Sequence, residues 1–202
     1  MVQGSLTLKS GKLESRNCAG LIYRPTGGTR GIAILDGLLR VTQLRGFPVA
    51  GGNYVYSQSG GIVEIMGKGF GGAGYVTSQA AFNINNIGHQ FHFSGGTILL
   101  SGAASGLITS NPFILDIQSN ASSATGGLID FAPDSAWSFG SRIYDYNLSA
   151  NARFFNVRIR KVNGSVTIRA RNQTVINGSL TIEANSVLQM RTRNLFIGKD
   201  FT

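Results

Sequence analysis

A chain of 202 residues with 28 glycines, 42% hydrophobic and only 13% charged residues can bury a sizeable core, and its composition favours a folded all-β protein over intrinsic disorder. The single cysteine, Cys18, excludes an intramolecular disulfide framework and a cysteine-based zinc site. The net charge of +9 is uneven, because residues 1–150 contain nine basic and seven acidic residues and residues 151–202 contain nine and two. No run of about 18 apolar residues is present, so we expect no transmembrane segment.

A short phrase that reads Gly-Ser-apolar-Thr-apolar occurs at Gly4–Leu8, Gly164–Ile168 and Gly178–Ile182. Glycine can adopt the positive φ of a tight corner, and the alternation that follows sends the apolar side chains to one face and Thr to the other. The phrase therefore predicts short strands that begin directly after tight corners.

Pairs of glycines recur through the middle of the chain, with separations of 33, 35 and 31 residues, at Gly27-Gly28, Gly60-Gly61, Gly95-Gly96 and Gly126-Gly127. After the last three pairs an apolar-x-apolar strand begins at the same offset, whereas the strand after the first pair, Ile32–Ile34, begins two residues later. We therefore predict that residues 1–150 form irregular coils with a spacing of about 31–35 residues.

The last third of the chain consists of very short apolar-x-apolar segments that recur in three interleaved series. Val157 precedes Leu180 by 23 residues, Val166 precedes Leu188 by 22, and Val175 precedes Leu195 by 20. A three-sided coil has this periodicity when it is written as a sequence. Residues 151–202 are thus predicted to form regular coils of about 20–23 residues.

These periods predict an all-β protein, a right-handed parallel β-helix or solenoid with three-sided coils and little or no helix. No segment of about 12 residues keeps a helical apolar pattern without an interrupting glycine. A β-sandwich would show turns about every 8–12 residues and no longer period. We expect residues 1–202 to form one domain, and because neither end has the sequence of a cap, we expect it to be a fragment of a longer chain.

Residues 154–202 resemble the β-helix repeats of large secreted surface proteins of Bacteroidota. The matching phrases are Phe154 with Asn156–Ile159, then Ile176–Ile182, Leu188–Met190 and Leu195–Thr202. The resemblance implies a non-enzymatic structural segment of an adhesin-like bacterial protein that is secreted or held at the cell surface. Coils of that family are usually neutral, and this chain differs from them in its arginines.

Those arginines form three i, i+2 pairs, which are Arg158 and Arg160, Arg169 and Arg171, and Arg191 and Arg193. Residues two apart in a strand point to the same side, so stacked coils are expected to place these guanidinium groups together on one outer face. Such a face suits an acidic polysaccharide, lipopolysaccharide or extracellular nucleic acid. The alternative is a solvated face that keeps the protein soluble.

Two other functions remain open from the sequence. Parallel β-helices also form polysaccharide lyases and glycoside hydrolases, which need clustered carboxylates, and the candidates here are Asp116, Asp130 and Asp134. A segment of a phage tail fibre or spike is the third possibility, and it would be distinguished by trimerisation.

The remaining candidates are aromatic residues and histidines. Trp137, Tyr144 and Tyr146 could stack on sugar rings, or could cover an edge of the core. His89 and His92 are the only histidines and have no third ligand near them in the sequence, so no metal site and no cofactor are predicted.

Overall fold

The computed structural model describes all residues except 1–3, 16–19, 24–27, 47–51, 68–79, 85–87, 103–112, 120, 134–141, 149–150 and 163. The described residues form strands and no helix. All of the pairings between these strands are parallel. The predictions of an all-β protein and of parallel strands are therefore confirmed.

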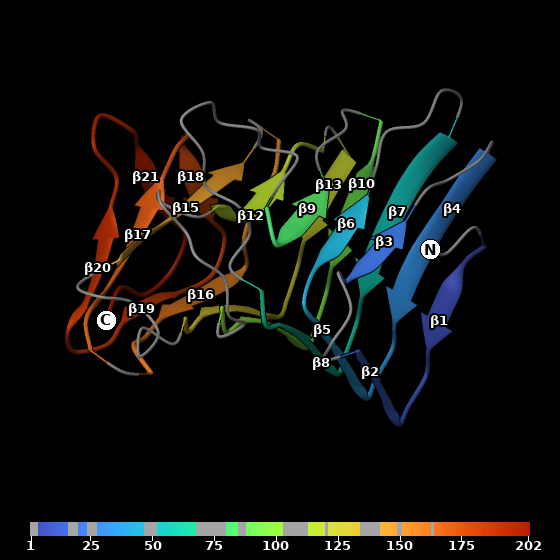
Figure 1. Cartoon of the computed structure of the whole chain (residues 1–202). Helices are drawn as coiled ribbons and strands as arrows, with labels where there is room; N and C mark the ends of the chain where they lie inside the picture. The colour runs from blue at the N-terminus through green and yellow to red at the C-terminus, as the bar shows by residue number, and fades with distance from the viewer. Residues whose placement is uncertain are drawn as a thin grey trace.

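The strands lie in three large sheets and one small pair (Figure 1). The first sheet contains β1 (Leu6–Leu8), β4 (Gly28–Ile34), β7 (Gly52–Gln58), β10 (Gln90–Phe93) and β13 (Ala121–Ala124). The second contains β2 (Lys12–Ser15), β5 (Leu38–Val41), β8 (Ile62–Ile65), β11 (Thr97–Leu100), β14 (Leu128–Phe131), β16 (Asn156–Ile159) and β19 (Leu180–Ile182). The third contains β3 (Leu21–Tyr23), β6 (Leu44–Gly46), β9 (Phe82–Ile84), β12 (Phe113–Ile117), β15 (Arg142–Leu148), β17 (Val166–Ala170) and β20 (Ser186–Gln189). The small pair is β18 (Thr174–Ile176) with β21 (Leu195–Ile197).

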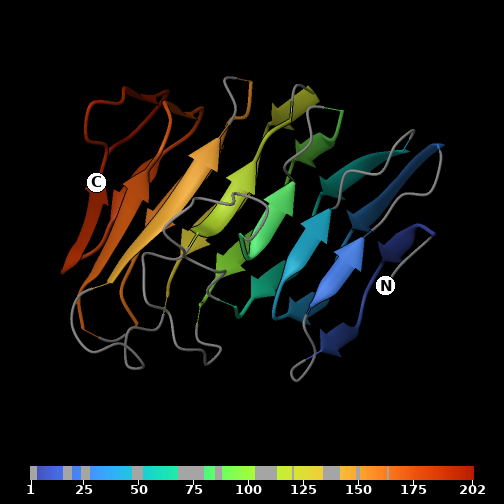
Figure 2. The same cartoon turned by 45° about the horizontal axis from the view of Figure 1, so that its top comes forward.

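Successive strands enter the sheets in a fixed order. From β1 to β15 the chain visits the first, second and third sheets in turn, five times over. Beyond β15 the β18–β21 pair takes the place of the first sheet in this order. We call each set of three successive strands a circuit. The circuits stack from the N-terminus at one end to the C-terminus at the other (Figures 1 and 2), an arrangement that is compatible with a parallel β-helix.

Glycines at one corner set the pairing register of the second sheet. Val63, Ile98 and Ile129 are register partners, and these are the strand positions at the shared offset from the last three Gly-Gly pairs. The second glycine of each pair has a positive φ, 63° at Gly61, 79° at Gly96 and 82° at Gly127. The carbonyl oxygen of each of these glycines also accepts a hydrogen bond from a backbone N–H of the next circuit, as Gly61 O does from Thr97 N at 2.9 Å. The corner is thus built from left-handed glycines stacked over one another.

Other expected alignments differ from the observed register. Ile32 lies in β4 of the first sheet, so the Gly27-Gly28 pair does not belong to the series of glycine corners that precede strands of the second sheet. The corner before β5 is formed instead by Gly37, which has φ of 83°. Val157 does pair with Leu180. Val166, however, pairs with Ser186, and Val175 pairs with Phe196.

The core is a single cluster of apolar side chains contributed by all three large sheets. Ile32, Tyr56 and Phe91 are register partners in successive strands and are all buried. The rings of Tyr56 and Phe91 stack with centroids 5.6 Å apart and planes 11° apart. Because alternate residues of each strand point inward, the charged residues between them are placed on the outer faces of the sheets.

Candidate functional site

Asp130 in β14 is bound by two arginines of the following circuit. Arg158 lies opposite it in β16 and donates from Nε at 3.2 Å and from a terminal nitrogen at 2.7 Å. The Nε of Arg160 lies 3.1 Å from both carboxylate oxygens. Asp130 is almost fully buried, and its hydrogen bonds raise the pKa of Arg158. These two arginines therefore neutralise a carboxylate of the protein itself.

Asp145 in β15 repeats this arrangement on the third sheet. Arg169, opposite it in β17, donates from Nε at 2.5 Å and from a terminal nitrogen at 2.7 Å. Arg171 donates to the same carboxylate at 2.5 Å, and its guanidinium carbon lies 5.9 Å from the centre of the Phe113 ring. Burial raises the pKa of Asp145, and the positive charges of Arg169 and Arg191 oppose this shift. Arg169 is itself buried and is not available to an external ligand.

Arg191 and Arg193 lie in a tight turn that follows β20. The turn is closed by the bond from Arg193 N to Met190 O at 3.0 Å, and Arg191 occupies it with φ of 54°. Both side chains are exposed. Among the residues that the structure describes, no acidic side chain forms an ion pair with either of them. These two arginines remain open to solvent and to ligands.

The six predicted arginines consequently do not form one array. Arg158 lies in β16 of the second sheet and Arg160 directly follows that strand, whereas the other four belong to or follow strands of the third sheet. We define the basic patch as Arg171, Arg191 and Arg193, with the Asp145–Arg169 pair beneath it. Burial, and secondly the charge of Arg191, lower the pKa of Arg171. The patch therefore carries more positive charge than its one carboxylate offsets.

The candidate catalytic carboxylates are not brought together. Asp116 lies in β12 of the third sheet, and Asp130 lies in β14 of the second sheet. Asp116 is buried and accepts hydrogen bonds from Gln118 and Asn147, both at 3.0 Å. Asp134 lies outside the described residues. The geometry provides no acid and base pair from Asp116 and Asp130.

The two tyrosines that the sequence suggested for sugar stacking do not lie on the surface. Tyr144 and Tyr146 are buried in the core, where Tyr146 packs 5.5 Å from the ring of Phe131. Tyr146 also hydrogen bonds through its hydroxyl to Thr174 Oγ1 at 2.7 Å. A buried ring cannot stack on a sugar, so these tyrosines have a structural role. Trp137 lies outside the described residues.

The two histidines face different surroundings. His89 is fully buried, with its ring 5.6 Å from that of Tyr54, and burial lowers its pKa to about 4. His92 lies on the outer face, with Nδ1 2.8 Å from Ser123 Oγ and Nε2 3.1 Å from Gln90 Oε1. Within the described part of the chain, no group of three or more His, Cys, Asp or Glu side chains could hold a metal ion.

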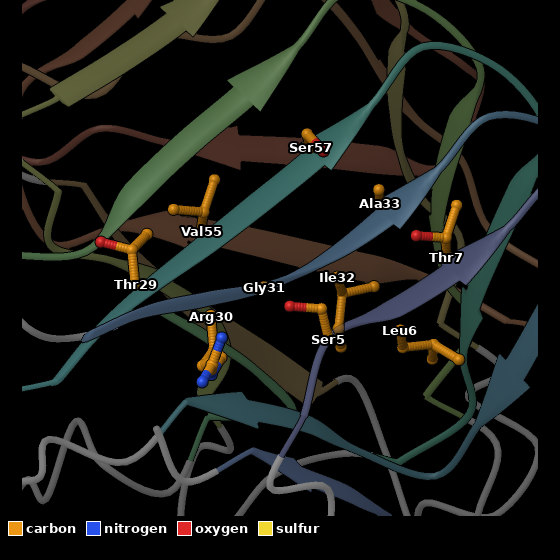
Figure 3. Close-up of a pocket in the computed structure, with 10 residues that line it drawn as sticks. All are labelled: Ser5, Leu6, Thr7, Thr29, Arg30, Gly31, Ile32, Ala33, Val55 and Ser57. Atoms are coloured by element: carbon orange, nitrogen blue, oxygen red, sulfur yellow. The ribbon is translucent and has the colours of Figure 1, made fainter. Parts of the chain in front are cut away.

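A shallow hollow of about 260 Å³ lies on the outer face of β1, β4 and β7 (Figure 3). Its floor is formed by small side chains such as Thr7, Ala33 and Ser57 on these three adjacent strands. Arg30 is the one charged residue among those that line it. The hollow therefore lacks the carboxylates or histidines that acid–base chemistry requires.

One charged row was not expected from the sequence. Glu14, Arg40 and Glu64 are register partners in β2, β5 and β8 of the second sheet. Arg40 donates to Glu64 at 2.6 Å and to Glu14 at 3.2 Å, and the bond to Glu64 contributes most to raising the pKa of Arg40. Arg40 and Glu64 are each the polar middle of an apolar-x-apolar strand, a signal that indicates their outward placement, whereas Glu14 stands between Leu13 and Ser15 and lacks it.

Comparisons with known proteins give no relative. No protein-family model matches the chain, and neither a curated protein nor a solved structure matches it. In the described residues there is no helix with the length and apolar character needed to cross a membrane. The assignment of a role therefore depends on the fold and on the charged faces.

Proposed function

We propose that the chain is a right-handed, three-sided parallel β-helix that serves as a structural segment of an exported bacterial surface protein and binds an acidic polysaccharide through its C-terminal circuits. The recurrent order of the three sheets supports the solenoid. The right-handed sense is supported by the strong preference of crossover connections between parallel strands for that hand. The export and the bacterial surface are implied by the resemblance of residues 154–202 to surface-protein repeats.

The excess of positive charge in the last circuits is the observation that carries the binding role. Residues 151–202 contain nine basic and two acidic residues. Asp130 and Asp145, both from the preceding circuit, bind four of the nine basic residues but offset only two charges. A surplus of fixed guanidinium groups on a rigid sheet attracts polyanions and slows their dissociation.

A structural and binding role is favoured over catalysis by the positions of the carboxylates. Glycoside hydrolases and lyases need ionisable side chains that converge on one bond of the substrate. Asp116 and Asp130 instead lie in different sheets, and Asp130 is held by two arginines. We therefore propose that the chain holds a polysaccharide without cleaving it.

Chromatography and a product assay test this proposal. The chain is applied to immobilised alginate and heparin, with neutral dextran as the control, and eluted with rising salt. We expect retention on both acidic polymers, lost stepwise between roughly 0.1 and 0.5 M salt, and no retention on dextran. Absence of retention at low salt would refute the binding role. New reducing or unsaturated ends in alginate or pectin would refute the non-catalytic role.

A further inference from the structure

Arg171 and Arg191 stand at matching positions just beyond the ends of β17 and β20, two neighbouring strands of the third sheet. The pairing of β17 with β20 continues as far as Arg169 with Gln189, and each arginine follows two residues later in its own segment. The charge of Arg191 acts to lower the pKa of both Arg171 and Asp145, in keeping with these matching positions. Neighbouring parallel strands are about 4.8 Å apart, so two long side chains that follow matching strand ends start within reach of one anionic group.

The first of these arginines is held in a fixed position. One terminal nitrogen of Arg171 donates to the buried Asp145 at 2.5 Å, and its guanidinium carbon lies 5.9 Å from the centre of the Phe113 ring. Its side chain is about one-fifth exposed, with a relative accessibility of 22%. Arg171 is thus already ordered before a ligand arrives, which lowers the entropy that binding would cost.

The second arginine occupies an unfavourable backbone conformation. Arg191 has φ of 54°, in the left-handed region that costs an L-residue other than Gly or Asn roughly 1–2 kcal/mol. The comparable position in the turn before β20 carries Asn185, which tolerates its φ of 59°. Strained backbone of this kind is concentrated at functional positions. Arginine in place of Asn or Gly at this turn suggests a role for its side chain.

Together, three guanidinium groups and one carboxylate meet at this corner of the third sheet. Both carboxylate oxygens of Asp145 accept hydrogen bonds from Arg169 or Arg171. Arg191 forms no ion pair with an acidic side chain among the described residues. Like charges held side by side are unfavourable unless an anion lies between them. Guanidinium groups match the paired oxygens of carboxylates and sulfate esters.

We infer that Arg171 and Arg191 form an oxyanion subsite that binds a carboxylate or sulfate group of an acidic polysaccharide. This inference rests on the proposed function and locates it at one corner of the molecule. Single-stranded nucleic acid is disfavoured because its binding uses exposed rings that stack on bases. Phe113, the ring beneath Arg171, is buried, and the exposed rings of Phe196 in β21 and of Phe201 lie outside the third sheet.

The test compares Arg191→Gln with Lys161→Gln. Both changes remove one positive charge in the last third of the chain, and neither residue forms an ion pair with a described acidic side chain. Affinity for alginate and for heparin is measured by calorimetry at a fixed low salt concentration, and thermal unfolding checks that both variants fold. We expect Arg191→Gln to weaken binding by about tenfold or more, and Lys161→Gln by less than about twofold.

The outcomes separate the two proposals. If the unmodified chain binds neither polymer, the proposed function itself fails. If it binds but both variants lose affinity equally, binding is diffuse and the subsite is refuted. Binding of alginate, whose only anionic groups are carboxylates, shows that a carboxylate suffices, whereas binding of heparin but not of alginate or of desulfated heparin shows that a sulfate is needed, and both results support the subsite. Tighter binding of duplex DNA than of either polysaccharide at the same salt would overturn the ligand class.

A conservative variant tests the geometry of the subsite. Arg191→Lys keeps the charge but lacks the planar fork that contacts two oxygens at once. We expect its affinity to lie between those of the unmodified chain and Arg191→Gln. Affinity equal to that of the unmodified chain would contradict an oxyanion held by two guanidinium forks.

Discussion

Asp145 and Arg169 stand opposite each other in β15 and β17 and form a two-pronged ion pair that is buried on both sides. The two residues are 24 positions apart in the sequence, so the pair joins one circuit to the next. Breaking such a pair costs more than the pair contributes, because the remaining charge stays buried without a partner.

We therefore expect Asp145→Ala to lower the free energy of unfolding by about 3–5 kcal/mol. Urea unfolding followed by circular dichroism provides the measurement. Glu183→Gln is the matched control. Glu183 is exposed, and its carboxylate lies as far as 4.0 Å from Arg158 Nε, so the ion pair is weak and the unfolding midpoint of this variant should stay unchanged. The double change Asp145→Leu with Arg169→Met should recover most of the loss, and no recovery would contradict the role of an unpaired buried charge.

The stacked corner glycines permit a second matched comparison. Gly11 and Gly96 share φ of 79°, but only at Gly96 would a side chain collide with backbone, namely the carbonyl oxygens of Gly60 and Gly61. Gly11→Ala should cost about 1–2 kcal/mol from backbone strain alone. Gly96→Ala should cost at least about 2 kcal/mol more, because the neighbouring circuit must shift.

Chemical denaturation of both glycine variants distinguishes strain from stacking. Gly4→Ala, where a side chain would meet nothing within 4 Å, serves as a reference that leaves stability unchanged. Equal losses at Gly11 and Gly96 would show that the close stacking of circuits at this corner contributes little.

His89 gives the fold a defined response to acid. Burial lowers its pKa to about 4, while the unfolded chain retains a pKa of about 6.5. Between these values the unfolded state binds more protons than the folded state, so stability falls as the pH is lowered from about 6.5 to about 4. The loss attributable to His89 should be on the order of 2 kcal/mol.

Replacement of each histidine separately identifies the source of that loss. His89→Phe puts an aromatic ring beside the buried rings of the first sheet and should flatten the dependence of the unfolding free energy on pH in this interval. His92→Gln changes a half-buried position on the outer face and should leave that pH dependence in place. A slope that survives in His89→Phe would assign the acid sensitivity to the buried carboxylates instead.

The glycine spacing predicted part of the register because a left-handed corner is a local requirement. Gly61, Gly96 and Gly127 each need φ that other residues avoid, and the strand follows at a fixed offset. Only the second glycine of each pair has this conformation. A pattern of glycine pairs therefore misses Gly37, which follows an aspartate, and includes Gly27-Gly28, although Gly28 is the first residue of β4 in another sheet.

The arginine pairs show what a single sequence leaves undetermined. The i, i+2 spacing predicts that Arg158 and Arg160 point to the same side, and they do bind the same carboxylate. Their partner, Asp130, precedes Arg158 by 28 residues, a spacing that none of the recognised periods contains. Circuit length varies with the loops between strands, so the sequence does not reveal which charges become neighbours.

The row of Glu14, Arg40 and Glu64 restricts how such a stack can grow. Deletion of the circuit that carries Arg40 would bring Glu14 opposite Glu64, and duplication of that circuit alone would bring Arg40 opposite a second Arg40. Duplication of two successive circuits would preserve the alternation of charge. Tandem duplication in even numbers is therefore the route by which this part of the gene could lengthen without placing like charges together.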